Sequence, residues 1–128
     1  MKLNRIDHVA IICSDYQKSK EFYVNLLGLE IIQEIHRLER RSCKLDLSLN
    51  GLYQIELFSF PDPPSRLTNP EARGLRHLAF QVDDLDKAVE ELKRKGVATE
   101  AIRVDTSRNK RCFFFQDPDG LPIEFCEA

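Results

Sequence analysis

One short pattern occurs twice in this sequence, and it constrains the fold more than any other feature. Ile6-Asp7-His8-Val9-Ala10-Ile11 returns as Leu75-Arg76-His77-Leu78-Ala79-Phe80, and Ile55-Glu56-Leu57 returns as Ile123-Glu124-Phe125. The spacing between the two histidines equals the spacing between the two glutamates to within one residue. A constant period of this kind predicts two similar structural units. Each unit would supply one imidazole and one carboxylate.

The composition narrows the class of protein. Hydrophobic residues make up 42% of the 128 residues and charged residues 31%, which is typical of a globular domain with a real core. The formal net charge of −2 gives no reason to expect a nucleic-acid partner. No apolar run approaches the roughly 20 residues that span a bilayer, and residues 1–5 do not resemble a signal peptide. We therefore expect a cytoplasmic protein with no membrane partner.

Hydrophobic periodicity predicts the same order of elements in both halves. In the first half it predicts a strand over 6–13, a helix over 15–27, and strands over 30–38, 43–49 and 53–60. In the second half it predicts a strand over 75–82, a helix over 84–95, and strands over 98–104, 110–116 and 121–126. Ser14 and Asp83 are the expected helix N-caps. Asn50-Gly51 and Asp117-Pro118-Asp119-Gly120 are the expected hairpin turns.

Each half is thus predicted to be β-α-β-β-β, and the predicted fold class is α+β with two paired βαβββ modules. Module 1 spans residues 1–60, and module 2 spans residues 75–128. The proline-containing segment 61–74 is the expected linker within a single domain of residues 1–128. Residues 105–109 are expected to form an irregular loop that could cover a site.

The four cysteines form no C-x-x-C pair and no zinc-finger spacing. Cys13 and Cys126 lie in apolar, strand-like runs, so we expect buried free thiols there. Cys43 and Cys112 lie among charged residues, so we expect them to be more exposed. A disulfide framework is not expected in a chain with this much hydrophobic core.

Strand alternation places the repeated polar residues on one side of each predicted sheet. In the predicted strands, His8 and His77 point away from the apolar residues that flank them, and so do Glu56 and Glu124. The helices should pack on the apolar face. If the two sheets curve together, these four side chains can converge.

Two histidines and two glutamates are a suitable ligand set for a divalent first-row metal ion, with zinc, nickel, manganese, iron and cobalt all acceptable. Such an ion would act as a Lewis acid, and a glutamate released from it could serve as a general base. The alternative is that duplication copied a structural histidine and glutamate, since a single strand histidine is more often a hydrogen-bonded residue than a ligand. His36 has no counterpart in the second half and is expected to lie on the surface or to line a cleft.

These motifs resemble the vicinal oxygen chelate superfamily, and specifically its glyoxalase I-like members. The resemblance covers nearly the whole chain and includes the His and Glu motifs above, Phe22-Tyr23-x-x-Leu26-Leu27-Gly28-Leu29, and Asp117-Pro118-Asp119-Gly120-Leu121-Pro122-Ile123-Glu124-Phe125. It implies paired βαβββ modules that form a U-shaped cleft around one metal ion. His8, Glu56, His77 and Glu124 stand at the four metal-ligand positions of the family.

The resemblance also implies a reaction. Glyoxalase I isomerises the hemithioacetal of methylglyoxal and glutathione, while its metal ion stabilises an enediolate and a ligand glutamate moves a proton. By this resemblance Glu124 is the first choice for the base and Glu56 the second. Glyoxalase I enzymes commonly carry an arginine four residues after the first metal histidine, where it helps to bind glutathione. Here that position is Ile12, so another thiol adduct or a hydroxy-carbonyl compound is an alternative substrate.

The same motifs are compatible with other functions. The same cleft could serve a thiol transferase or an epimerase, although those relatives usually differ at one ligand position. A non-catalytic protein that sequesters a small molecule is the alternative from another class, but such binders generally lack the ligand residues. The family pattern implies a homodimer, and the cleft could form within one chain or between two.

Overall fold

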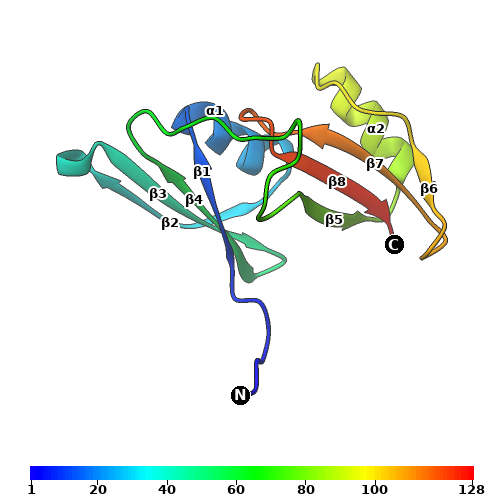
Figure 1. Ribbon diagram of the computed structural model, residues 1–128, viewed down its shortest axis with the longest axis horizontal. Helices are drawn as coiled ribbons and strands as arrows, with labels where there is room; N and C mark the ends of the chain where they lie inside the picture. The colour runs from blue at the N-terminus through cyan, green and yellow to red at the C-terminus, as the bar shows by residue number, and fades with distance from the viewer. The chain divides into compact units, whose positions relative to one another are not determined.

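The computed structural model describes residues 1–128, which fall into two compact units, Met1–Pro64 and Ser65–Ala128 (Figure 1). We refer to them as unit 1 and unit 2. The boundary lies inside the proline-containing segment that the sequence indicated as a linker. Whether the two units act as one domain stays a prediction.

Unit 1 contains a four-stranded sheet with one helical segment. In chain order its elements are β1 (Val9–Cys13), α1 (Tyr16–Lys20), a π-helical continuation η1 (Glu21–Leu26), β2 (Glu30–Arg37), a 3-10 turn η2 (Leu38–Arg40), β3 (Ser42–Leu49) and β4 (Leu52–Ser59). The strand order is β1-β4-β3-β2. β1 runs parallel to β4, and the other neighbours are antiparallel. Residues before β1 extend away from this sheet (Figure 1).

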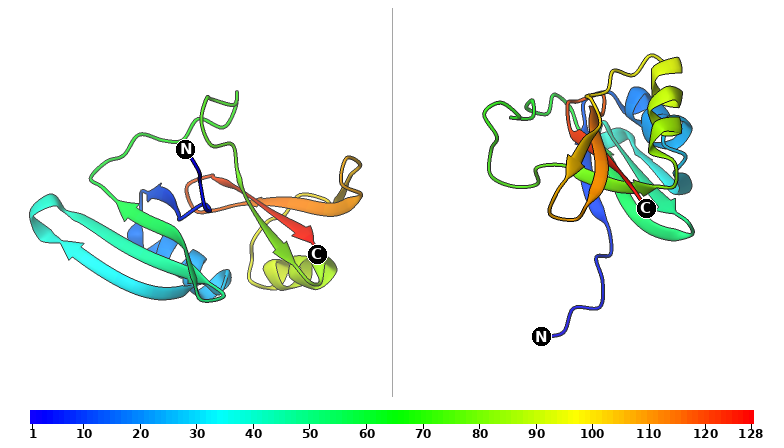
Figure 2. Two further views of the ribbon diagram at one scale, coloured as in Figure 1. Left: turned by 90° about the horizontal axis from the view of Figure 1, so that it is seen from below. Right: turned by 90° about the vertical axis from the view of Figure 1, so that its right-hand side faces the viewer.

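Unit 2 repeats this topology. Its elements are β5 (Leu78–Val82), α2 (Leu85–Arg94), β6 (Arg103–Asp105), β7 (Lys110–Gln116) and β8 (Pro122–Glu127), and the strand order is β5-β8-β7-β6. β5 is parallel to β8, as β1 is to β4. Both views in Figure 2 show α2 on one face of this sheet. The α+β class and the paired βαβββ modules are therefore confirmed.

The helices begin one residue later than the sequence suggested. Asp15, and not Ser14, caps α1 by accepting a hydrogen bond from the Lys18 backbone N–H at 3.1 Å. Asp84, and not Asp83, caps α2 by accepting one from the Lys87 N–H at 2.9 Å. Serine and aspartate are both favoured N-cap residues, so the residue types at 14 and 15, and at 83 and 84, could not decide between the two positions. Neither α1 nor α2 has the length and hydrophobicity of a membrane-crossing helix.

The turns form as expected. Asn50 and Gly51 both have positive φ, 52° and 80°, which suits a two-residue hairpin loop between β3 and β4. The Asp117 carboxylate accepts hydrogen bonds from the backbone N–H groups of Asp119 and Leu121, both at 2.9 Å. These bonds hold the turn between β7 and β8 and thereby fix the register of the two strands.

Each unit buries its apolar residues between the sheet and its helix. α1 packs against β4, and α2 packs against β8. The fully or nearly fully buried side chains in unit 1 include Tyr23, Leu45, Leu47, Ile55 and Leu57, and those in unit 2 include Leu85, Leu92, Phe113, Phe115 and Ile123. Ile55 and Leu57 flank Glu56, so the strand alternation used in the sequence analysis holds for β4.

Two expectations about secondary structure were wrong in detail. The strand expected over 98–104 is reduced to β6 and one isolated bridge between Thr99 and Phe115. The segment expected as a loop over 105–109 begins inside β6, since Asp105 pairs with Lys110. Residues 98–102 carry no strong alternation of apolar and polar residues, which explains why the pairing there is so limited.

The cysteine expectations were correct for two of four residues. Cys13 is a buried thiol outside any disulfide, and Cys43 is a partly exposed one. Cys112 and Cys126, however, form a disulfide and are 0% and 6% exposed. They are directly paired residues on β7 and β8, and this pairing brings their sulfur atoms together. The expectations of an exposed Cys112, of a free Cys126 and of no disulfide were therefore wrong.

Candidate metal centre

The two glutamates occupy matching positions in the two sheets. Glu56 lies on β4 beside Ala10 of β1, and Glu124 lies on β8 beside Ala79 of β5. In each unit the neighbour on the parallel strand is therefore an alanine, which leaves space around the carboxylate. Glu124 is 5% exposed, so a charged group has been placed in a largely buried position. A buried carboxylate requires a partner.

The sequence predicted both histidines inside strands, but the structure places each of them just before its strand begins. β1 begins at Val9 and β5 at Leu78, so His8 and His77 each precede the first paired residue. Each histidine still lies two residues before the alanine that neighbours its glutamate. The imidazoles consequently reach their glutamates, with Nε2 to Oε2 distances of 3.8 Å for His8–Glu56 and 3.1 Å for His77–Glu124.

In unit 1 the pair is held by neighbouring side chains. Nδ1 of His8 lies 2.8 Å from a carboxylate oxygen of Asp7, which leaves Nε2 as the nitrogen that faces Glu56. The ring of Tyr53 stacks on the His8 ring, with centroids 4.8 Å apart. The hydroxyl of Tyr53 donates a hydrogen bond to Glu56 Oε2 at 2.8 Å. One tyrosine thus contacts both members of the pair.

A further charged pair lies beside Glu56. Asp46 is the register partner of Glu56 on β3, and its Oδ1 is 3.1 Å from the Tyr53 hydroxyl. Nζ of Lys44 lies 3.3 Å from Asp46 and 3.5 Å from Glu56. Burial and the hydrogen bonds to Glu56 and Asp46 raise the pKa of Tyr53 well above its usual value. Tyr53 therefore remains a hydrogen-bond donor throughout the physiological pH range.

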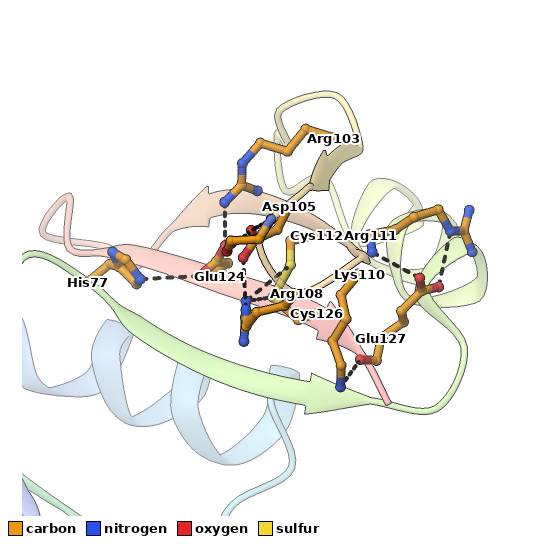
Figure 3. Close-up of a disulfide and its surroundings, with 11 residues drawn as sticks. His77, Arg103, Asp105, Arg108, Lys110, Arg111, Cys112, Glu124, Cys126 and Glu127 are labelled. Atoms are coloured by element: carbon orange, nitrogen blue, oxygen red, sulfur yellow. Dashed lines mark hydrogen bonds and ion pairs between the residues drawn. A yellow bond between two sulfur atoms is a disulfide. The ribbon is translucent and has the colours of Figure 1, made fainter.

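In unit 2 the glutamate lies between a histidine and an arginine (Figure 3). Oε2 of Glu124 faces His77, and Oε1 accepts a hydrogen bond from Nη2 of Arg103. The guanidinium of Arg103 also lies over the ring of Phe114, 4.6 Å from its centroid. Phe114 is the register partner of Glu124 and meets the His77 ring edge to face at 5.1 Å. The two oxygens of this carboxylate thus have different partners.

The disulfide lies on the same face of the unit 2 sheet. Cys126 follows Glu124 by two residues on β8, and Arg103 is the register partner of Cys112. Figure 3 shows the two sulfur atoms beside Glu124, and an oxygen of that carboxylate and both sulfurs lie within 4.8 Å of one another. Nη2 of Arg108 approaches Cys126 at 3.5 Å and Cys112 at 3.8 Å.

The donor atoms of each pair suit a divalent metal ion. Two donors that each lie about 2.1 Å from one ion, at a right angle, are about 3.0 Å apart. The 3.1 Å between His77 and Glu124 agrees with that value. The 3.8 Å between His8 and Glu56 is longer than this value, and at the same bond lengths it corresponds to an angle of about 130° at the ion. Nδ1 of His77 is buried without a protein partner, so Nε2 is the nitrogen of this ring that engages the carboxylate.

His36 lies outside the candidate metal centre. It lies on β2 opposite Cys43 of β3, with Nδ1 3.2 Å from the Cys43 sulfur. Its Nε2 is 3.6 Å from Oε1 of Glu34. The other oxygen of that carboxylate, Oε2, accepts hydrogen bonds from Lys20 at 2.7 Å and from Tyr16 of α1. These contacts with the helix place His36 on the helix-covered side of the sheet, away from Glu56. The expectation of a surface residue fits, and its side chain is 53% exposed.

Sequence reasoning missed several residues that lie around the glutamates: Lys44, Asp46, Tyr53, Arg103 and Phe114. A signal for two of them was present, because Lys44 and Asp46 alternate with the buried Leu45 and Leu47. Charged residues at alternate positions of an otherwise apolar strand indicate a polar site on that face. No comparable signal marks Arg103, which lies in a weakly patterned segment.

The fold and the sequence together assign the chain to a known superfamily. The sequence model of the Glyoxalase/Bleomycin resistance protein/Dioxygenase superfamily matches residues 5–125. The chain therefore belongs to this superfamily, and the resemblance found in its motifs is confirmed.

Individual relatives cover almost the whole chain. The protein YwkD of Bacillus subtilis (strain 168) is 65% identical, with 99% of each chain covered. The crystal structure of a glyoxalase family protein from Enterococcus faecalis is 46% identical with a TM-score of 0.89, over 99% of this chain and 100% of the other. More distant similarity extends to two enzymes, each over 98% of this chain. Mitochondrial methylmalonyl-CoA epimerase of Homo sapiens is 28% identical over 75% of its length, and the metallothiol transferase FosB of Lysinibacillus sphaericus (strain C3-41) is 29% identical over 83%.

Proposed function

We propose that this protein is a metal-dependent enzyme of the glyoxalase type, a lyase or isomerase. Its substrate would be a small thiol adduct or a hydroxy-carbonyl compound. The observation that carries the proposal is the presence of one His–Glu pair in each unit at the same position of the same fold. His8, Glu56, His77 and Glu124 would together bind one divalent ion, as the family pattern implies.

The four ligands could come from one chain or from two chains of a homodimer. A pair of donors is too few for a stable site in either unit alone, because divalent first-row ions prefer four to six ligands. The proposal therefore requires both pairs. Relatives supply support for metal binding in this superfamily: FosB is named a metallothiol transferase, and FosX of Listeria monocytogenes has been crystallised with Mn(II).

A divalent ion in this site would supply Lewis-acid stabilisation to neighbouring oxygens of a substrate. The residues of this chain would hold and move protons. Glu124 remains the proposed base and Glu56 the second choice, since both carboxylates lie beside the imidazoles. Tyr53 would keep Glu56 and His8 in place, and Arg103 would hold one oxygen of Glu124 so that the other faces the ligand set.

Metal content tests the site directly. Protein purified without added metal, and the same protein after titration with manganese, nickel, zinc or cobalt, is measured by elemental analysis. His77→Ala should lower the bound metal sharply and leave the circular dichroism spectrum unchanged. His36→Ala is the matched control, because it removes an imidazole from the other side of the unit 1 sheet and should keep the metal. A His77→Ala protein that keeps its metal but unfolds would instead support a structural histidine.

Turnover tests the reaction. Metal-loaded protein is mixed with the hemithioacetals that methylglyoxal forms with glutathione and with other small thiols, and product formation is followed. Absence of turnover with every adduct would remove the lyase and leave a thiol transferase or an epimerase as the second candidate. A protein that is metal-free when purified and gains no metal on titration would favour the sequestering binder.

A further inference from the structure

Two sulfur atoms and one carboxylate lie together in the interior of unit 2. Cys112 on β7 and Cys126 and Glu124 on β8 each offer one metal-ligand atom, and these three atoms lie within 4.8 Å of one another. All three residues are buried. Figure 3 shows the two sulfur atoms bonded to each other beside the carboxylate. The disulfide bond therefore keeps two atoms that could bind a metal ion from doing so.

Strand pairing places the sulfurs where one ion could join them. Cys112 and Cys126 are register partners, and Glu124 precedes Cys126 by two residues, so the three side chains share one face of the sheet. Two sulfurs bound to one tetrahedral zinc ion are about 3.8 Å apart. The Cα atoms of the two cysteines are 4.2 Å apart. Once the sulfur–sulfur bond is broken, rotation about the Cα–Cβ bonds can reach that separation without movement of the strands.

This set of ligand atoms favours an ion with a preference for sulfur. Thiolates select zinc and softer ions, whereas carboxylates alone suit harder ones. Zinc centres with three protein ligands keep a fourth position open for water or another molecule. Two thiolates and one carboxylate match that number of protein ligands. The proposed metal centre formed by the His–Glu pairs has only nitrogen and oxygen donors, so reduced unit 2 would offer a different kind of ligand.

Two arginines supply positive charge around these atoms. Nη2 of Arg108 lies 3.5 Å from the sulfur of Cys126 and 3.8 Å from that of Cys112. An ion pair with Asp105 at 2.8 Å holds Arg108 in this place. A guanidinium contributes little beside a neutral disulfide, but it stabilises negative charge on sulfur. A divalent ion would leave one negative charge on two thiolates and a carboxylate, and Arg103, which donates a hydrogen bond to Glu124, can balance that charge.

The cover over the sulfurs is the short hairpin between β6 and β7. β6 has three residues, and its last pair joins Asp105 to Lys110. The side chain of Arg108, in the loop of this hairpin, is 54% exposed. A strand that pairs through so few residues opens at a lower cost in free energy than the central strands of the sheet. A small reductant or a metal ion can reach the buried sulfurs by this opening.

We infer that reduced unit 2 binds a thiophilic divalent ion, such as zinc or cadmium, through the sulfurs of Cys112 and Cys126 and the carboxylate of Glu124. The inference goes beyond the proposed function and shares only Glu124 with it. A dithiol supplies two electrons and two protons to the sulfur–sulfur bond and is itself oxidised to a disulfide, which leaves two thiols in the protein. Binding of the ion releases both thiol protons to solvent. The oxidation state of the cysteine pair thus decides whether this site exists.

Cadmium is the probe, because cadmium–thiolate bonds give an ultraviolet charge-transfer band that cadmium bound through nitrogen and oxygen lacks. The protein is reduced with a phosphine, freed of reductant without air, and titrated with cadmium beside the oxidised protein. Both titrations use the Cys43→Ser variant, because Cys43 is a partly exposed thiol that could bind cadmium by itself. We expect the band in the reduced protein, with a single cadmium ion per chain, and none in the oxidised protein. Absence of the band after reduction would overturn the inference.

Three further substitutions in the same background identify the ligands. Cys112→Ser should abolish the band. Glu124→Gln should keep it but bind cadmium at least about tenfold more weakly, because even a hydrogen-bond partner of a ligand typically contributes that much to metal affinity. Glu127→Gln is the matched control, since Glu127 also lies on β8 but pairs with Arg111 at 3.1 Å. Equal cadmium affinity in the two glutamate variants would overturn the three-ligand site.

Urea unfolding separates binding by the folded unit from binding by an unfolded chain. An ion that binds the folded site raises the urea midpoint of the reduced protein, and an ion captured by thiols of the unfolded chain lowers it. We expect cadmium to raise the midpoint, and to leave it unchanged in Cys112→Ser. A lowered midpoint would overturn the inference. Failure of the oxidised protein to bind manganese, nickel, zinc or cobalt would overturn the proposed function alone and leave this inference standing.

Discussion

The hydroxyl of Tyr53 lies 2.8 Å from Oε2 of Glu56, while its ring stacks on His8. A single aromatic side chain therefore fixes the two proposed metal ligands of unit 1 relative to each other. Loss of a hydrogen bond that orients a ligand typically lowers metal affinity by roughly 10–100-fold.

We expect Tyr53→Phe to lower the metal affinity by about tenfold while the protein stays folded, because the phenyl ring keeps the stacking and loses only the hydrogen bond. Competition with a chromophoric chelator measures this change. Tyr16→Phe is the matched control, since Tyr16 also donates a hydrogen bond to a glutamate, Glu34, but on the helix-covered side of the sheet. Equal losses in both variants would show that Tyr53 has no special link to the metal.

The Cys112–Cys126 disulfide should stabilise unit 2 against unfolding. The two cysteines are 14 residues apart, and closing a loop of this size contributes about 3 kcal/mol in the chain-entropy description. We expect Cys112→Ser, or reduction of the wild-type protein, to lower the free energy of unfolding by up to that amount in urea titrations. The Cys112→Ser variant should no longer respond to a reducing agent. A wild-type protein that is equally stable with and without reductant would contradict this prediction.

Cys43 should be the one thiol that reacts rapidly in the folded protein. Cys13 is buried, and Cys112 and Cys126 are bonded to each other. Nδ1 of His36, 3.2 Å from the Cys43 sulfur, can accept the thiol proton and so assist its reaction with an aromatic disulfide reagent. We expect His36→Ala to slow that reaction several-fold, to about the rate of an ordinary exposed cysteine. Cys43→Ser should abolish the rapid phase, and an unchanged rate in His36→Ala would show that the imidazole plays no part.

Glu34 should make the stability of unit 1 depend on pH. Hydrogen bonds from Lys20 and then from Tyr16 lower the pKa of Glu34 below its usual 4.5. The stabilisation is therefore complete above the unfolded-state pKa and is lost as the pH falls through the folded-state pKa. We expect Glu34→Gln to cost about 1 kcal/mol at neutral pH, and the difference from wild type to disappear in acid.

Urea unfolding at several pH values, read in parallel for wild type and Glu34→Gln, measures this dependence. Glu91→Gln serves as the control, because Glu91 forms only an exposed pair with Lys95 at 3.6 Å. Such a pair contributes little at any pH. A Glu34→Gln difference that persisted unchanged in acid would mean that the effect is not electrostatic.

The repeat and the periodicity were enough to predict the order of elements in both units. They succeeded because apolar residues flank Glu56 on β4 and Glu124 on β8, and because the turns carry residues that suit their backbone geometry. The exact start of a strand was beyond this reasoning. His8 and His77 each lie one residue before the first paired residue of a strand.

The contacts around the glutamates depended on strand register, which periodicity does not give. Arg103 reaches Glu124 because β6 pairs with β7 at Cys112, and that pairing involves only three residues. The disulfide could have been anticipated, since Cys112 and Cys126 lie at equal distances along the chain from Asp119 in the turn. A hairpin folded about that turn brings the two cysteines opposite each other, whatever the overall composition of the chain.

The register partners of the two glutamates, Asp46 in unit 1 and Phe114 in unit 2, are chemically unlike. If both units descend from one ancestral half, the strands that carry the glutamates have kept their character and the strands beside them have diverged. Two identical halves would give both glutamates the same neighbouring residues. The two glutamates therefore have unlike surroundings in this chain, charged in unit 1 and aromatic in unit 2.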